Sequence, residues 1–110
     1  MNEQFLAVIK DTTPATIVTI NANPAHVVNT WSHYIHVVND HTLLIPSAGM
    51  HSIENDFPTD NHLTIAVGSY QVPGTDEFQT SGAYFDVMKA QFDWIRAVLV
   101  VHVDDIEQKI

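Results

Sequence analysis

The sequence contains 110 residues, with 13 acidic and 4 basic side chains and a formal net charge of −9. A chain of this length forms one compact domain. Its few scattered cations exclude nucleic-acid binding and a polybasic membrane tether, both of which need clustered positive charge. Because there is no cysteine, disulfide scaffolds, thiolate metal sites and cysteine nucleophiles are excluded as well.

The first half of the chain predicts one short helix followed by three strands. Phe5, Leu6 and Ile9 share one helical face, and Asp11–Pro14 ends the helix and turns the chain. Runs rich in β-branched and aromatic residues then alternate with turn residues, a pattern typical of antiparallel strands joined by short connections. We expect these strands over Ala15–Ile20, His26–Val38 and Thr42–Ile45.

The second half predicts two more helices and two more strands. Met50–Phe57 fits a short helix, and Phe85, Met88 and Phe92 recur at helical spacing in a second one. The strands are expected over His62–Ser69 and Arg96–Val103, with a loop over Tyr70–Thr80 that contains Pro73 and Gly74. The sequence therefore predicts a single mainly β domain over residues 1–110, with five antiparallel strands in a small barrel and three short helices.

The seven histidines do not form a recognisable metal site. His33 and His36 are three residues apart on an expected strand, so their side chains would point to opposite faces. No His-Glu-x-x-His motif is present, and we expect surface or loop histidines and no bound metal. A Ser-His-Asp triad is not excluded by one sequence, but no Gly-x-Ser-x-Gly motif supports it. There is also no glycine-rich phosphate loop.

Aromatic and polar side chains alternate in the segment Asn29–Tyr34. On a strand, Trp31 would share one face with His33, and Thr30, Ser32 and Tyr34 would share the other. A second indole, Trp94, precedes the last expected strand. Two interpretations remain open at this point: the aromatic rings pack in a core or interface, or they hold a flat heteroaromatic ligand whose polar groups meet the neighbouring hydroxyls and amides.

Several segments of the chain, taken in order, resemble the FMN-binding split-barrel family, whose members are pyridoxamine 5'-phosphate oxidase-like. The resemblance is strongest to the small bacterial FMN-binding proteins, and its segments span nearly the whole sequence. No single segment is specific to this family, but the order in which all of them occur is. The matching segments are Val27–Trp31, Ile45–Pro46 leading to Gly49–His51, Gly68–Ser69, Phe78–Gly82 and Phe92–Val100.

This resemblance implies a small split β-barrel that forms a homodimer, with FMN bound at the subunit interface. The aromatic residues Trp31, Tyr34 and Trp94 match positions close to the flavin ring, and Asn29, Thr30 and Ser32 would bind ring or ribityl atoms. Met50, His51, Ser52 and Ile53 match the segment that holds the FMN phosphate, where free N–H groups attract an anion.

Two features depart from the family pattern. The small FMN-binding proteins have a Lys-Thr pair where this chain has Ser52 and Ile53, and loss of one charged hydrogen bond weakens binding by roughly ten- to a hundredfold. Between Gly74 and Phe78 the chain is also shorter by most of a strand. Because an absent inner strand would expose two sheet edges, we expect residues to be missing between Gly74 and Thr75. A Cα–Cα distance above about 3.8 Å would reveal the break.

Three functions follow from these observations. The first is a cytoplasmic FMN-dependent flavoprotein with a flavin reductase-like or electron-transfer role, in which the flavin carries the electrons and no side chain need act as an acid. Its redox partner or small-molecule substrate is unknown. The second is a non-catalytic split-barrel binding module that has lost or weakened FMN binding. The third is a structural dimer without a ligand.

Overall fold

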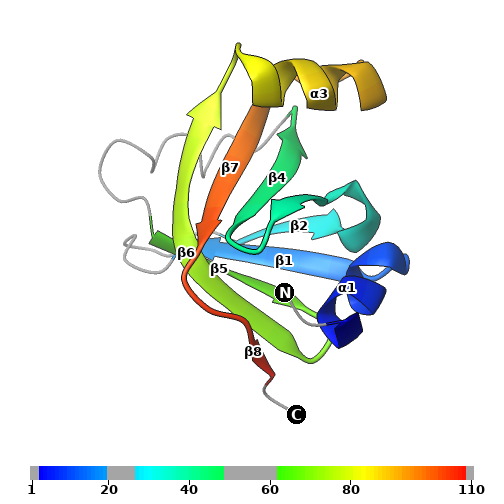
Figure 1. The fold of residues 1–110 in the computed structure, drawn as a ribbon, viewed down its shortest axis with the longest axis vertical. Coiled ribbons are helices and arrows are strands. Elements are labelled where there is room, and N and C mark those ends of the chain that lie inside the picture. The colour runs from blue at the N-terminus through cyan, green and yellow to red at the C-terminus, as the bar shows by residue number, and fades with distance from the viewer. Residues whose placement is uncertain (1–2, 20–26, 49–61, 109–110) are drawn as a thin grey trace.

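The computed structural model describes residues 3–19, 27–48 and 62–108. Over these residues the chain forms two α-helices and eight antiparallel strands, and the sheet curls into a half-barrel (Figure 1). This architecture confirms the mainly β split barrel that the sequence predicts. The helices are α1 (Glu3–Lys10) and α3 (Ala83–Gln91). The strands are β1 (Pro14–Thr19), β2 (Val27–Trp31), β3 (His36–Asn39), β4 (Thr42–Ser47), β5 (His62–Val67), β6 (Tyr70–Gln79), β7 (Ala97–Val103) and β8 (Glu107–Gln108).

The sheet runs in the order β2-β1-β5-β6-β7-β4-β3, so β2 and β3 form its two edges although they are neighbours in the sequence. A 3-10 turn, η1 (Ser32–Tyr34), connects them. The expected single strand over His26–Val38 is therefore wrong. Its two parts pair with different partners, β2 with β1 and β3 with β4, because η1 turns the chain from one edge of the sheet to the other.

The expected loop over Tyr70–Thr80 is also wrong, because almost all of it forms the strand β6. Tyr70 and Val72 face the interior at every second position, and Phe78 continues this period-two pattern and packs against the same core. Pro73 does not interrupt the strand, and its carbonyl accepts a hydrogen bond from the Asp104 N–H at 2.9 Å. Burial against the barrel therefore overrides the local turn signal of Pro73 and Gly74.

Gly74 and Thr75, between which the sequence predicted missing residues, lie within β6. Both residues are paired on both sides: with Leu63 and His62 of β5, and with Val103 and His102 of β7. The first half of β6 pairs with β5 and the second half with β7, so a single strand links the two neighbours without exposing an inner edge. A Cβ added at Gly74 would lie 2.5 Å from the His102 carbonyl oxygen, so β6 and β7 approach each other closely here.

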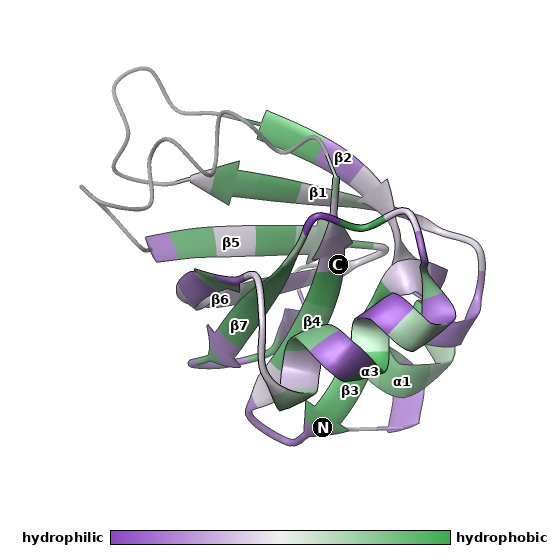
Figure 2. Cartoon of the chain, turned by 90° about the horizontal axis from the view of Figure 1, so that it is seen from above, coloured by the Kyte–Doolittle hydropathy of each residue, from purple (hydrophilic) through white to green (hydrophobic). Residues whose placement is uncertain are grey.

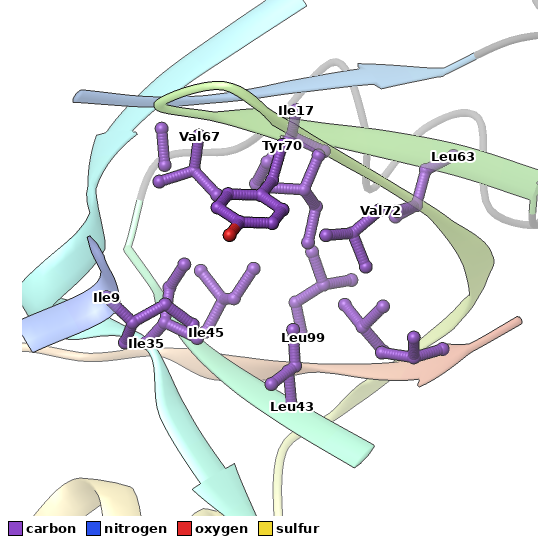
Figure 3. Close-up of a cluster of buried hydrophobic side chains, with 14 of the residues drawn as sticks. Ile9, Ile17, Ile35, Leu43, Ile45, Leu63, Val67, Tyr70, Val72 and Leu99 are labelled. Atoms are coloured by element: carbon purple, nitrogen blue, oxygen red, sulfur yellow. The ribbon is translucent and has the colours of Figure 1, made fainter. Parts of the chain in front are cut away.

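A hydrophobic core fills the interior of the curled sheet (Figure 3). The Tyr70 ring lies among aliphatic side chains, and it meets Phe5 of α1 edge to face, with ring centroids 5.4 Å apart. The α1 helix thus covers one opening of the barrel. The buried residues of this core are Phe5, Ile9, Ala15, Ile17, Ile35, Leu43, Ile45, Leu63, Ile65, Val67, Tyr70, Val72, Leu99, Val101 and Val103.

A second, smaller core lies between α3 and the outer face of β4 and β7. Along β7, the odd-numbered residues point into the barrel, while Val98 and Val100 point outward to α3. Met88 of α3 is fully buried against them, together with Leu44 and Ile95. Figure 2 shows the result: α3 carries both polar and apolar residues, whereas the strands β4 and β7 behind it are mostly apolar. Both faces of β7 are therefore covered.

The strands expected over Ala15–Ile20, His62–Ser69 and Arg96–Val103 agree with β1, β5 and β7 to within two residues at each end. Helices are also found where the spacing around Phe5 and Met88 predicts them. The predicted helix over Met50–Phe57 lies outside the described residues. In the part of the chain that the structure describes, no helix combines the length and apolar character needed to cross a membrane.

Candidate functional site

The turn η1 is held in place by a buried serine. The Ser32 side chain is fully buried, and its hydroxyl donates a hydrogen bond to the Asp11 carbonyl oxygen. The Ser32 hydroxyl oxygen also accepts a hydrogen bond from the Thr13 N–H at 3.1 Å, and the Ser32 N–H donates to the Thr13 carbonyl at 2.7 Å. Ser32 therefore fixes η1 to the connection between α1 and β1, and its hydroxyl is engaged within the protein.

The residues before η1 alternate along the edge strand β2. Asn29 and Trp31 are exposed, while Val28 and Thr30 are half-buried on the opposite face, where Val28 packs against the core. The Asn29 side-chain oxygen accepts a hydrogen bond from the Thr16 hydroxyl at 2.8 Å, which orients the amide on the outer face of β1 and β2. Trp31 keeps 45% of its surface exposed.

The residues after η1 lead into a cluster of three aromatic rings. Tyr34 meets Phe92 edge to face with centroids 5.4 Å apart, and it meets Trp94 at 5.8 Å. Phe92 and Trp94 lie 5.6 Å apart, so each ring contacts the other two. The His33 ring lies 4.4 Å from Tyr34 at the edge of this aromatic cluster. Trp94 nevertheless remains 48% exposed, so it presents an aromatic face to the outside.

The path of the chain around Trp94 is fixed by Lys89 of α3. Its ammonium group donates hydrogen bonds to the carbonyl oxygens of Asp93, at 2.5 Å, and Ile95, at 3.0 Å. These two acceptors flank Trp94 in the sequence. The Phe92 N–H bonds to the Met88 carbonyl at 2.8 Å and ends the helix. Lys89 thus hydrogen-bonds carbonyl groups just beyond the helix end, and these bonds fix the connection that carries Trp94.

The structure brings together only some of the residues predicted to form the site. Tyr34 and Trp94 are in ring contact, and Trp31 lies next to η1 but is not in ring contact with the other two in the described structure. The expectation that Ser32 and Tyr34 alternate with His33 across a strand is wrong, because these residues form a turn. The phosphate-binding candidates Met50, His51, Ser52 and Ile53 lie outside the described residues.

Sequence reasoning missed the site roles of two residues. Phe92 was expected to pack on a helix face, but it lies just past the end of α3 and contacts both Tyr34 and Trp94. Lys89 carried no motif that pointed to its two carbonyl partners. The available signal was the position of Lys89 in the last turn of a helix, where cations favourably meet carbonyl groups.

A second cation, Arg96, follows Trp94 by two residues in the sequence. Its side chain is exposed, and its backbone N–H donates to the Ser47 carbonyl at 2.9 Å, where β4 and β7 meet. On another face, His102 Nε2 lies 3.4 Å from Glu77 Oε1. Because both side chains are about half exposed, this contact contributes little to stability. Across residues 3–19, 27–48 and 62–108, no three His, Asp or Glu side chains gather in a metal-binding group.

Comparisons with known proteins agree with this fold. The chain is 33% identical to the FMN-binding protein of Nitratidesulfovibrio vulgaris (strain DSM 19637 / Miyazaki F) over 116 residues, covering 94% of each chain. Its fold is similar to HupZ of group A Streptococcus, with a TM-score of 0.82, 19% identity, and 98% and 93% of the two chains covered. It is also similar to an FMN-binding protein of Syntrophomonas wolfei, with a TM-score of 0.68, 15% identity, and 84% and 74% covered. No family model matches the sequence.

Proposed function

The chain belongs to the FMN-binding split-barrel family, and on this premise we propose that it is a flavoprotein that binds FMN at the interface of a homodimer. The relative from Nitratidesulfovibrio vulgaris, which matches along almost its whole length, is named an FMN-binding protein. When bound, FMN supplies the capacity to accept and release electrons, while the protein binds and orients it.

The observation that carries this proposal is the pair of half-exposed indoles, Trp31 and Trp94. Burying large aromatic side chains is favourable, so leaving two of them open is unusual unless a ligand or partner covers them. The Trp94 ring is fixed by the aromatic cluster and by Lys89, so it is preorganised to receive a planar ring. These residues fit a flavin, because the flat apolar ring of Trp31 lies on the same exposed face of β2 as the amide of Asn29.

The dimer part of the proposal is supported by the edge strand β2. Val27 at its start keeps 60% of its surface exposed and shares the outer face with Trp31. A second copy of the chain would cover this face, and the low proportion of charged residues, 15%, suits a chain with a covered surface. We assign Asn29, Trp31, Tyr34 and Trp94 to the ring end of the site, while Thr30 lies on the opposite face of β2. Ser32 has the supporting role of fixing η1.

We further propose a flavin reductase-like or electron-transfer role. Pyridoxamine phosphate would bring a second phosphate, and Arg96 is the one arginine available to grip it. A substrate without such a group suits this chain better. The assay for the role is oxidation of reduced nicotinamide cofactors in the presence of FMN, followed by addition of a one-electron acceptor. A protein that does not oxidise the nicotinamide, but whose FMN passes electrons to that acceptor after it has been reduced with dithionite, would favour the electron carrier over the reductase.

The experiment that tests FMN binding is a titration of the purified protein, followed by flavin absorption and fluorescence. We expect uptake at micromolar FMN with quenched fluorescence, because indole and phenol rings close to a flavin quench its emission. Trp94→Ala and Trp31→Ala should each weaken binding or restore fluorescence. Val87→Ala, which removes exposed apolar surface from α3 without an aromatic ring, is the matched control. A folded protein that takes up no FMN would favour the non-catalytic binding module instead.

A further inference from the structure

The phosphate of FMN carries two negative charges, and this chain at −9 has few groups that can balance them. Of its four cations, Lys89 is bonded to two carbonyl oxygens, and Lys109 lies outside the described residues. Lys10 and Arg96 remain, both with exposed side chains. Lys10 lies at the end of α1, whereas Arg96 follows the connection that carries the aromatic cluster. We propose that Arg96 binds the phosphate of FMN, an inference that rests on the proposed function.

The position of Arg96 supports this assignment. Its N–H bonds to the Ser47 carbonyl, so the arginine stands at the end of β4, one residue before β7 begins. Trp94 is two residues away along the chain, and two residues of extended backbone span at most about 7 Å. A flavin ring against Trp94 would therefore lie within a ribityl chain's reach of Arg96. One short connection would then supply both the ring contact and the charge contact.

The chemistry of the side chain fits the same role. A guanidinium group is charged at every physiological pH and offers five N–H donors in a planar fork that matches phosphate oxygens. Within the described structure the Arg96 guanidinium makes no hydrogen bond or ion pair, so it need not break a contact to meet a ligand. The backbone hydrogen bond to Ser47 fixes the main chain at Arg96. Less conformational entropy is therefore lost when the side chain binds a ligand.

Riboflavin tests the assignment, because it shares the ring and ribityl chain of FMN but has no phosphate. We compare the dissociation constants of both flavins for the wild type, Arg96→Gln and the matched control Lys10→Gln, which removes the same charge elsewhere. For Arg96→Gln we expect FMN binding to weaken by about tenfold or more and riboflavin binding to stay within about twofold. Lys10→Gln should change neither dissociation constant by more than about twofold. The FMN dissociation constant of Arg96→Lys should lie between those of the wild type and Arg96→Gln.

The two proposals fail in different ways. Wild-type protein that binds neither flavin would overturn the proposed function and, with it, the role of Arg96. Wild-type protein that binds FMN, while Arg96→Gln binds it equally well or loses both flavins to the same extent, would overturn the role of Arg96 alone. Because the Arg96 side chain is exposed, Arg96→Gln should have the same unfolding temperature as the wild type. If it does not, Arg96→Lys is the second variant, with a smaller expected loss of FMN affinity and unchanged riboflavin affinity.

Discussion

Gly74 is the position at which β6 changes partners, and Gly74→Ala tests that arrangement directly. The added Cβ would lie 2.5 Å from the carbonyl oxygen of His102 and 3.2 Å from its carbonyl carbon. Real Cβ atoms keep at least 3.0 Å from such neighbours, so β6 and β7 must separate by about 0.5 Å or more. The obstacle is backbone inside a paired ladder, so no side chain can rotate to make room.

The magnitude follows from opposing effects. Overpacking of this kind costs about 1–3 kcal/mol, and replacing glycine stabilises a protein by about 0.4–1 kcal/mol through the unfolded chain. The midpoints of these two ranges leave a net loss of about 1 kcal/mol. For a chain of this length, the midpoint of thermal unfolding should fall by about 4–8 °C.

The assay is thermal unfolding followed by circular dichroism, with Thr75→Ala as the control. Thr75 lies in the same two ladders but points to the outer face, so its truncation should cost less than about 1 kcal/mol. A Gly74→Ala protein that unfolds at the wild-type temperature would refute the close approach of β6 and β7. It would also refute the view that one strand serves both neighbours.

Three further variants test the supports of the site. Ser32→Ala removes the hydroxyl that joins η1 to Asp11 and Thr13, so urea denaturation should show a loss of about 1–3 kcal/mol; an unchanged midpoint would mean that η1 is held by other contacts. Lys89→Met keeps the aliphatic stem but loses both hydrogen bonds to the carbonyls of Asp93 and Ile95. In a Trp31→Phe background, where Trp94 is the remaining tryptophan, we expect its fluorescence emission to shift. An unshifted spectrum would contradict the role of Lys89 in fixing Trp94. Met88→Ala should cost about 2–5 kcal/mol in the core beneath α3, and a loss below 1 kcal/mol would show that α3 packs loosely.

The sequence predicted most elements whose burial repeats with a regular period. The alternation of Leu63, Ile65 and Val67 indicates a strand because only one face meets the core, and the structure places β5 there. It failed where tertiary contacts override local preference. Pro73 and Gly74 read as a turn, but pairing on both sides keeps β6 extended. Ser32 sits among strand-forming residues, yet its contacts with distant residues bend the chain into η1.

The candidate site was predicted in part for the same reason. Trp31, Tyr34 and Trp94 could be named from their types and from the family resemblance, and the structure joins Tyr34 to Trp94. Lys89 could not be named, because its role depends on where the chain runs after α3 ends. The role proposed for Arg96 could not be predicted either, because its position beside Ser47 depends on the pairing of β4 with β7.

The central claim is that two copies of this chain bind FMN between them. Sedimentation velocity with detection at the flavin absorption band tests both parts at once. We predict that the flavin sediments as a single species with twice the mass of the chain and one FMN per chain, and that Val27→Glu on the edge strand releases flavin and protein monomer together. Flavin that stays at the mass of free FMN, while the folded protein sediments as a monomer, would contradict the account.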